Sequence, residues 1–193
     1  MVEDAVTSDS VGDPSRFRTL EELEHGLRAL PSASTRSGRV ALIVARRDGG
    51  RRDTLQRVRL TPGAGVPGDA WSRRVEPDGD AQITVMQMDV AQLLANGQPL
   101  TLFGDNLFVD LDLSVANLPT GSRLRLGTAV VVVTPKPHDG CRKFRARFGG
   151  DALRLVSMPA LRSRNLRGIY MRAVEPGEVA AGDAVEIVST APR

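Results

Sequence analysis

The chain has 193 residues, of which 41% are hydrophobic and 25% charged; this composition fits one globular domain with at most an appendage and excludes a disordered chain. Its 26 basic residues, 24 of them arginine, outnumber 23 acidic residues by only three, so no strong net field is expected. No apolar run approaches the roughly 20 residues of a membrane span, and the acidic start MVEDAVTSDSVGD is unlike a signal peptide, so we predict a soluble, cytoplasmic protein without a membrane partner.

The first 37 residues are predicted to precede the main domain. Residues 1–16 are polar and aperiodic and are expected to form a flexible tail. The sequence Thr19-Leu-Glu-Glu22 is typical of a capping box. Leucines then occupy one helical face before Pro31: Leu20, Leu23, Leu27 and Leu30. Residues 17–37 are therefore predicted to form an amphipathic helix and a linker, and the main domain is expected over residues 38–193.

The main domain is predicted to consist mainly of strands, punctuated by glycine and proline. Segments of β type are expected over 40–45, 55–60, 82–88, 107–113, 123–126, 129–134, 169–174 and 184–188. Between 107 and 113 the leucines and Val109 alternate with Phe108 and the aspartates, which predicts a strand with one buried face. No regular alternation of strand and helix supports a parallel sheet.

Few helices interrupt these strands. One is expected over 89–96, capped by Asp89 and stopped by Gly97, and two more pieces between Cys141 and Ser157, divided at Gly149-Gly150. The fold class predicted is therefore mainly β: a barrel of about eight strands, or a strongly curved sheet, with a few short helices.

The single cysteine, Cys141, excludes an internal disulfide and a cysteine-rich zinc site. It follows the most hydrophobic strand and two prolines, at the first turn of a predicted helix, where free N–H groups and the nearby basic residues favour a thiolate. Cys141 is thus a candidate nucleophile, persulfide carrier or ligand to a soft metal. The alternative is a buried structural cysteine.

His138 lies three residues before Cys141, with Asp139 between them. A catalytic Cys141–His138 pair with an orienting carboxylate is one interpretation of this spacing. A surface histidine in a proline- and glycine-rich turn is the other, since proximity in sequence does not establish hydrogen-bond reach.

The densest positive region begins directly after Cys141 and comprises Arg142, Lys143, Arg145, Arg147, Arg154, Arg162, Arg164, Arg167 and Arg172. Such a cluster near a helix start suits a phosphate group. A solvated helix face and a weak nucleic-acid patch are the alternatives. Nucleic acid is not favoured as a partner, because aromatic side chains that could stack on bases are scarce: the chain has only one Trp, one Tyr and five Phe.

Gly-Asp pairs at Gly68-Asp69, Gly104-Asp105 and Gly182-Asp183 are explained by turn chemistry. Asp69 and the Asp105-Asn106 pair are additionally candidates to face a common pocket. No segment has the spacing of a phosphate loop or of a dinucleotide-binding motif.

Read together in chain order, these motifs resemble a MOSC domain over about residues 38 to 188. The matching segments are Gly68-Asp69, Gln82-Ile-Thr-Val-Met86, Gly104-Asp-Asn-Leu107, Leu124-Arg-Leu-Gly127, His138-Asp-Gly-Cys-Arg-Lys143, Arg167-Gly-Ile-Tyr170, Pro176-Gly-Glu-Val179 and Gly182-Asp183. MOSC domains are found at the C-terminus of molybdenum cofactor sulfurases and as stand-alone bacterial proteins. Each segment is weak alone, and the ensemble carries the specificity.

The resemblance implies a β-barrel and a role with the molybdenum–pterin cofactor (molybdopterin): binding it, passing sulfur to it, or using it to reduce N-hydroxylated compounds. Cys141 matches the family's cysteine, the metal ligand or sulfur carrier. Asp105, Asn106, Arg142, Lys143, Arg145 and Arg167 are then cofactor-binding candidates, with the basic residues meeting the pterin phosphate. Pyridoxal phosphate is not expected, so sulfur would come from an external donor, and electrons from an electron-transfer partner.

Two departures distinguish the chain from the family pattern. Asp105-Asn106 stands where many members have Glu-Asn, and Ala70-Trp71-Ser72-Arg73 stands where many stand-alone members have a histidine. Enzymatic activity is therefore left open, and the alternative is a non-catalytic binding or sulfur-carrier module for the cofactor or a phosphorylated ligand.

Overall fold

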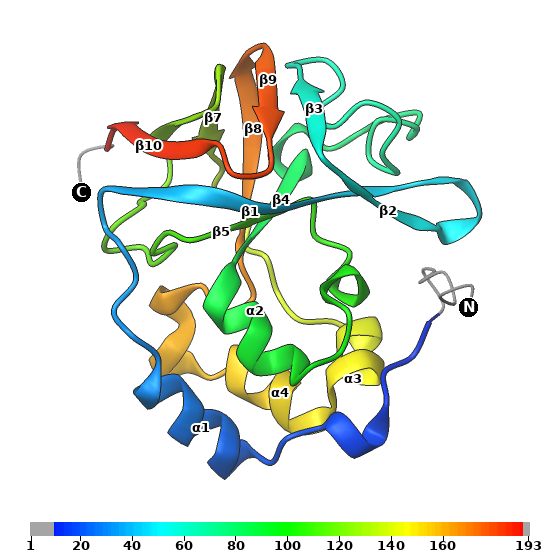
Figure 1. Ribbon diagram of the computed structural model, residues 1–193, viewed down its shortest axis with the longest axis vertical. Coiled ribbons are helices and arrows are strands. Elements are labelled where there is room, and N and C mark those ends of the chain that lie inside the picture. The colour runs from blue at the N-terminus through cyan, green and yellow to red at the C-terminus, as the bar shows by residue number, and fades with distance from the viewer. Residues whose placement is uncertain (1–9, 191–193) are drawn as a thin grey trace.

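The computed structural model describes residues 10–190 and consists of a closed β-barrel with a layer of helices against it (Figure 1). Seven strands close the barrel in the order β1 (Ser37–Arg46), β10 (Ala184–Ser189), β6 (Arg123–Leu126), β7 (Ala129–Val133), β8 (Ile169–Glu175), β4 (Ile83–Gln87) and β5 (Leu107–Val109), which returns to β1. An eighth strand, β2 (Arg52–Leu55), pairs with β1, and β3 (Arg57–Leu60) pairs with β9 (Gly177–Ala180) as a separate ribbon. The predicted mainly-β barrel is confirmed.

The helices lie together on one side of the barrel, below it in Figure 1. They are α1 (Leu20–Ala29), α2 (Met88–Ala95), α3 (Arg142–Phe148) and α4 (Gly150–Val156), with 3₁₀ turns η1 (Pro14–Arg16), η2 (Asp48–Gly50), η3 (Gly79–Ala81), η4 (Leu100–Phe103) and η5 (Pro159–Arg164). None of the helices between residues 10 and 190 has the length and apolar character to cross a bilayer.

Two apolar cores hold these layers. One fills the barrel and includes Val85, Leu107 and Ile169; the other lies between barrel and helices. In the second core the rings of Phe103 and Phe148 stack at a centroid distance of 4.0 Å. Strands β1, β4 and β5 contribute side chains to both cores, because they lie between the barrel interior and the helices.

The N-terminal segment joins this helical layer. Thr19 and Glu22 form the predicted capping box at the start of α1, and Leu23 and Leu27 are buried against the second core. Of the tail expected over 1–16, residues 1–9 lie outside the described residues. Residues 10–16 do contact the domain, since Gly12 N donates to Ala146 O at 3.0 Å.

Several predicted boundaries are wrong. The strand expected over 55–60 is split at Gln56 into β2 and β3, which belong to different sheets. The strand expected over 107–113 ends at Val109, and Phe108, assigned to the solvent face, is fully buried beneath the helices. The helix expected from Asp89 begins at Met88, with Gln87 as its cap; Asp89 instead accepts from the N–H of Val90.

One pairing matters for the site. Strands β4 and β5 are parallel, while the other pairs of the barrel are antiparallel, so the chain between them must cross over through α2 and η4. This crossover returns to the barrel at Gly104, Asp105 and Asn106.

Candidate functional site

The site is built around Asp105 and Asn106, which connect η4 to β5. Gly104 permits the turn there, because its φ of +73° is disfavoured for other residues. Both side chains then point inward and are buried, with 1% and 0% exposure. A buried carboxylate beside a buried amide needs partners, and these come from five distant segments.

Asn106 fastens three of these segments together. Its Oδ1 accepts from the N–H and hydroxyl of Thr84 on β4, at 3.1 and 3.0 Å. Its Nδ2 donates to Val44 O on β1 at 3.2 Å and to Asp69 Oδ1 at 3.1 Å. Asp69 and the Asp105-Asn106 pair, candidates to face a common pocket, are thus joined by a direct contact through Asn106.

Asp69 pairs with Arg46, the last residue of β1. Arg46 Nη2 lies 2.5 Å from Asp69 Oδ2, and its Nε reaches Oδ1 at 3.0 Å. Burial would raise the pKa of Asp69, but the hydrogen bonds and charge of Arg46 hold it below its usual value. The N–H of Trp71 also donates to Asp69, so the sequence after the Gly68-Asp69 pair is folded onto this carboxylate.

Asp105 faces two cationic or basic side chains from other parts of the chain. Arg167 Nη1 donates to its Oδ2 at 2.7 Å, and His138 Nε2 lies 3.6 Å from its Oδ1. Burial raises the pKa of Asp105, while the charges of Arg167, Arg46 and Arg52 oppose that rise. Asp105 Oδ1 and Arg167 Nε have no hydrogen-bond partner within residues 10–190.

His138 lies in the loop between β7 and α3, with its side chain only 7% exposed. Its ring packs on Tyr170 of β8, with centroids 4.4 Å apart. Burial, followed by the nearby charges of Arg167 and Arg46, lowers the pKa of His138 well below 6.5. The imidazole is therefore neutral at pH 7.

Positive charge exceeds negative charge around these carboxylates. Arg52 donates to the carbonyl oxygens of Thr101 and Leu102 at 2.7 and 2.9 Å and adds a third guanidinium near Asp105. Burial, with repulsion from Arg147 and Arg46, lowers the pKa of Arg52 to about 10. The three guanidinium groups around Asp69 and Asp105 thus leave this cluster with an excess of positive charge.

Cys141 is exposed and occupies the N-cap position of α3. Both flanks of this cysteine are anchored: Gly140 packs so closely on α4 that a Cβ there would lie 2.5 Å from Leu153, and Phe144 is 2% exposed. The guanidinium of Arg167 lies 5.2 Å from the centroid of the Phe144 ring. The Asp105–Arg167 pair therefore supports the first turn of the helix that carries the thiol.

The structure brings His138, Asp105, Asn106 and Arg167 into one buried cluster. It leaves the other predicted cofactor contacts, Arg142, Lys143 and Arg145, on the exposed side of α3. Asp139, the carboxylate proposed to orient His138, pairs instead with Arg162 at 3.2 Å, so Asp105 takes the place facing the imidazole.

Sequence reasoning missed Arg46, Arg52 and Tyr170 as members of this cluster. Arg46 and Arg52 carry no local signal, being two of 24 arginines. Tyr170, the only tyrosine of the chain, ends the matching segment Arg167-Gly-Ile-Tyr170, but nothing in the sequence places its ring against His138.

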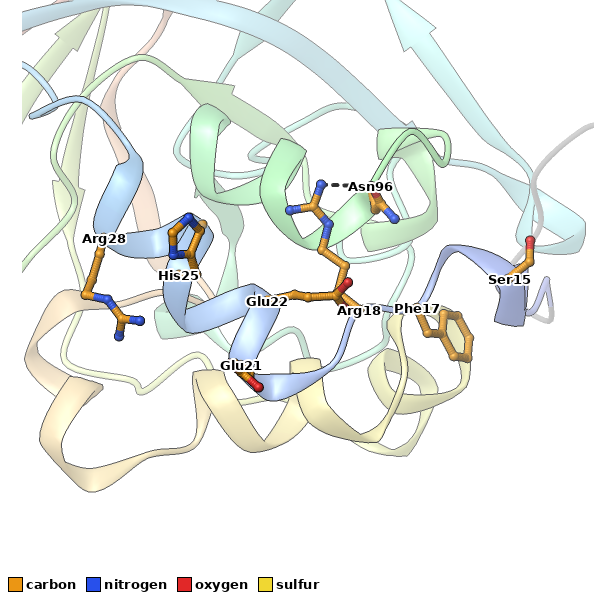
Figure 2. Close-up of a pocket in the computed structure, with 9 residues that line it drawn as sticks. Ser15, Phe17, Arg18, Glu21, Glu22, His25, Arg28 and Asn96 are labelled. Atoms are coloured by element: carbon orange, nitrogen blue, oxygen red, sulfur yellow. Dashed lines mark hydrogen bonds between the residues drawn. The ribbon is translucent and has the colours of Figure 1, made fainter.

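Two of the hollows on the surface bear on the description of the site. One, of about 600 Å³, runs along η1 and α1, where Arg18 donates to Asn96 and His25 lies at the exposed face of α1 (Figure 2). The other, of about 240 Å³, adjoins the buried cluster and is lined in part by His138 and Gly168. Within residues 10–190, no three His, Cys, Asp or Glu side chains gather in a way that could hold a metal ion alone.

The low pKa of His138 predicts a pH dependence of stability. Below pH 6.5 the imidazole of His138 binds a proton in the unfolded state but not in the folded state. The free energy of unfolding therefore falls with decreasing pH, by at most about 1.4 kcal/mol per pH unit. In His138→Phe, which keeps a ring on Tyr170, this part of the slope should vanish between pH 6.5 and 5. Urea unfolding at each pH measures it, with His25→Phe on α1 as the control. Equal slopes in wild type and His138→Phe would contradict the assignment.

Comparisons with known proteins agree with this architecture. A family model described as MOSC domain matches residues 69–186. The solved YuaD protein from Bacillus subtilis superposes with a TM-score of 0.54 at 19% identity, covering 78% of this chain and 95% of that one. YiiM from Escherichia coli gives 0.54 at 22% identity, covering 80% and 72%, and YiiM from Geobacillus stearothermophilus gives 0.50 at 19%, covering 79% and 75%. No curated protein matches the chain in sequence. At these identities the solved structures establish the fold alone.

Proposed function

The chain belongs to the MOSC domain family, and from this membership we propose that it binds the molybdenum–pterin cofactor, with Cys141 as the protein's ligand to the metal. The observation that carries the proposal is an exposed thiol fixed in place by buried structure on both sides. Gly140 packed on α4 and Phe144 beneath Arg167 hold this thiol at a fixed place on the surface.

The residues present fit such a group. A cofactor that brings its own ligands to the metal needs one accessible soft ligand from the protein, which the Cys141 thiol supplies. Arg142, Lys143 and Arg145 lie exposed on the same helix and suit a pterin phosphate. The guanidinium groups of Arg46, Arg52 and Arg167 around Asp105 add to the attraction for an anion.

Each part of the cluster then has a separate task. When bound, molybdenum supplies a two-electron redox change that amino-acid side chains cannot provide. Cys141 holds the metal, and the Asp105–Arg167 pair holds α3 through Phe144. Asn106 and Asp69 join the loop that carries Asp105 to the loop after Gly68, so they act as positioning residues. Reduction of N-hydroxylated compounds is the enzymatic version of this proposal.

The test measures molybdenum and pterin per chain, by elemental analysis and fluorescence, in protein purified from a cofactor-producing host. In Cys141→Ser, which exchanges one atom and keeps the N-cap, molybdenum content should fall at least about tenfold. The double variant Cys141→Ser/Ser157→Cys carries its only thiol at the exposed C-terminal end of α4. Its molybdenum content should stay as low as that of Cys141→Ser. Wild-type molybdenum content in Cys141→Ser would refute the role of Cys141.

A sulfur-carrier module is the second candidate, and Trp71 favours it. Trp71 is 5% exposed and its Nε1 donates to Asp78 O, so it presents no reactive group where many stand-alone members have a histidine. In this version Cys141 carries a persulfide received from an external donor. Absence of molybdenum from the wild type, together with a persulfide on Cys141 in its mass spectrum, would replace the first proposal by the second.

A further inference from the structure

The C-terminal end of α3 is held by a segment that is far away in the sequence. Gly12 N donates to Ala146 O at 3.0 Å. Gly12 is buried, and a Cβ at this position would stand only 1.8 Å from Arg147 O. The two backbones are therefore in direct contact, and any side chain at position 12 would push the segment away from the helix.

Gln98 bridges the same two segments. It lies between α2 and η4, in the crossover from β4 to β5, and is 8% exposed. Its Oε1 accepts from the N–H of Asp13 at 2.7 Å, and its Nε2 donates to Arg147 O at 3.2 Å. Arg147 contacts the segment in turn, since its Nε donates to Ser10 O at 3.3 Å. Residues 10–13 and Gln98 are called the N-terminal latch below.

The length of α3 explains why it needs such support. The helix has seven residues, fewer than an isolated helix requires to be stable in water. The last carbonyl groups of a helix have no partner inside it, and the latch supplies donors to those of Ala146 and Arg147. Phe144 and Phe148 bury one face of α3, but apolar contacts are not directional. The hydrogen bonds of the latch are directional and fix the helix along its axis.

The position of α3 is also the position of the thiol. Cys141 is the N-cap of α3, and its carbonyl oxygen accepts from Arg145 N at 3.0 Å. From this geometry we propose that Gln98 is a positioning residue: through the latch it fixes α3, and α3 fixes where the Cys141 thiol stands. The inference rests on the proposed function only for what the thiol binds.

The first test follows the thiol without any metal. Cys141 is the only cysteine of the chain, so a trifluoromethyl label attached to it through a disulfide reports this position alone. In Gln98→Leu, which removes both hydrogen bonds at similar size, the fluorine resonance should shift or broaden. In the unlabelled variant the amide of Arg145 should exchange at least about tenfold faster than in the wild type. Gln92→Leu, at an exposed position of α2, should change neither measurement.

A second variant disrupts the latch with Gln98 intact. Gly12→Ala places a methyl group against Arg147 O and should produce the same two changes. Gly79→Ala, where a Cβ would meet no atom within 4 Å, is its matched control. In both latch variants the amides of β7 and β8 should keep their protection, which separates a loosened helix from a misfolded protein. An unchanged label in Gln98→Leu and Gly12→Ala, or an equal loss of protection in the barrel, would overturn the proposal.

Molybdenum content then tests what the position is for. If the wild type carries the cofactor, Gln98→Leu should hold about threefold less molybdenum per chain, or lower still. Wild-type molybdenum content together with a shifted label would overturn the assignment of Gln98 as a positioning residue. A wild type without molybdenum would contradict the cofactor proposal instead, and the label and the exchange rates would still decide whether the latch holds Cys141.

Discussion

Replacing Arg167 by methionine is expected to lower the free energy of unfolding at pH 7 by about 3–5 kcal/mol. The reason is not the lost hydrogen bond alone. Asp105 is 1% exposed, so without Arg167 its charge remains buried beside only the more distant guanidinium groups of Arg46 and Arg52. Folding must then either tolerate that charge or protonate the carboxyl group.

Denaturant unfolding of three variants distinguishes this mechanism from lost packing. Adding Asp105→Asn to Arg167→Met should recover at least half of the loss, because the stranded charge is removed. The loss should also shrink as pH falls towards 3.8, since the raised pKa of Asp105 lets the folded variant take up a proton before the unfolded one does. Arg172→Met, which breaks an exposed pair 3.9 Å from Asp80, should cost under about 1 kcal/mol. A double variant no more stable than Arg167→Met would contradict the charge argument.

Asn106→Asp is the second large effect, although it exchanges a single NH₂ for an oxygen. The new oxygen would face Val44 O and Asp69 Oδ1, two acceptors that now receive hydrogen bonds from Nδ2. Both are left without that donor and the carboxylates repel, so we expect a loss of about 3 kcal/mol or more at pH 7. The same unfolding measurement checks this.

Asn96→Asp is the matched control. Asn96 Oδ1 accepts from Arg18 at 2.9 Å, and its Nδ2 donates to Arg16 O at 2.9 Å, an exposed contact that water can replace in the aspartate. Its left-handed backbone, with φ of 47°, suits aspartate as well as asparagine. Its cost should stay within about 1 kcal/mol. Comparable losses at both positions would mean that the buried network around Asn106 is not what the structure describes.

The elements that local signals specify were predictable from the sequence. The capping box at Thr19 and the division of α3 from α4 at Gly149 both depend on residues within one or two turns. The assignment of β2 and β3 to different sheets, strand β9, and the parallel partner of β4 depend on pairing between distant segments, which periodicity does not encode. Phe108 illustrates the limit: its position in an alternating pattern indicated solvent, but the helices of the second core cover it.

The candidate site was predictable in its residues and less so in its contacts. Asp69 and Asn106 do meet, as their Gly-Asp contexts suggested, and the family resemblance is confirmed by the match over 69–186. The partner of His138 was not predictable, because Asp139 is adjacent in sequence and Asp105 is adjacent only in space. Arg46 is recognisable as a site residue only from the structure, in which the end of β1 lies beside Asp69.

The seam of the barrel has a consequence for how the protein is made. Strand β1 closes the barrel against β10, with Ser37 opposite Glu186 and Arg39 opposite Ala184. On a ribosome, β1 emerges early and its partner among the last segments, so the seam cannot form until nearly the whole domain has left the exit tunnel. Until then β1 and β6 each present an unpaired edge, and the barrel's apolar lining stays open to chaperones and to neighbouring chains.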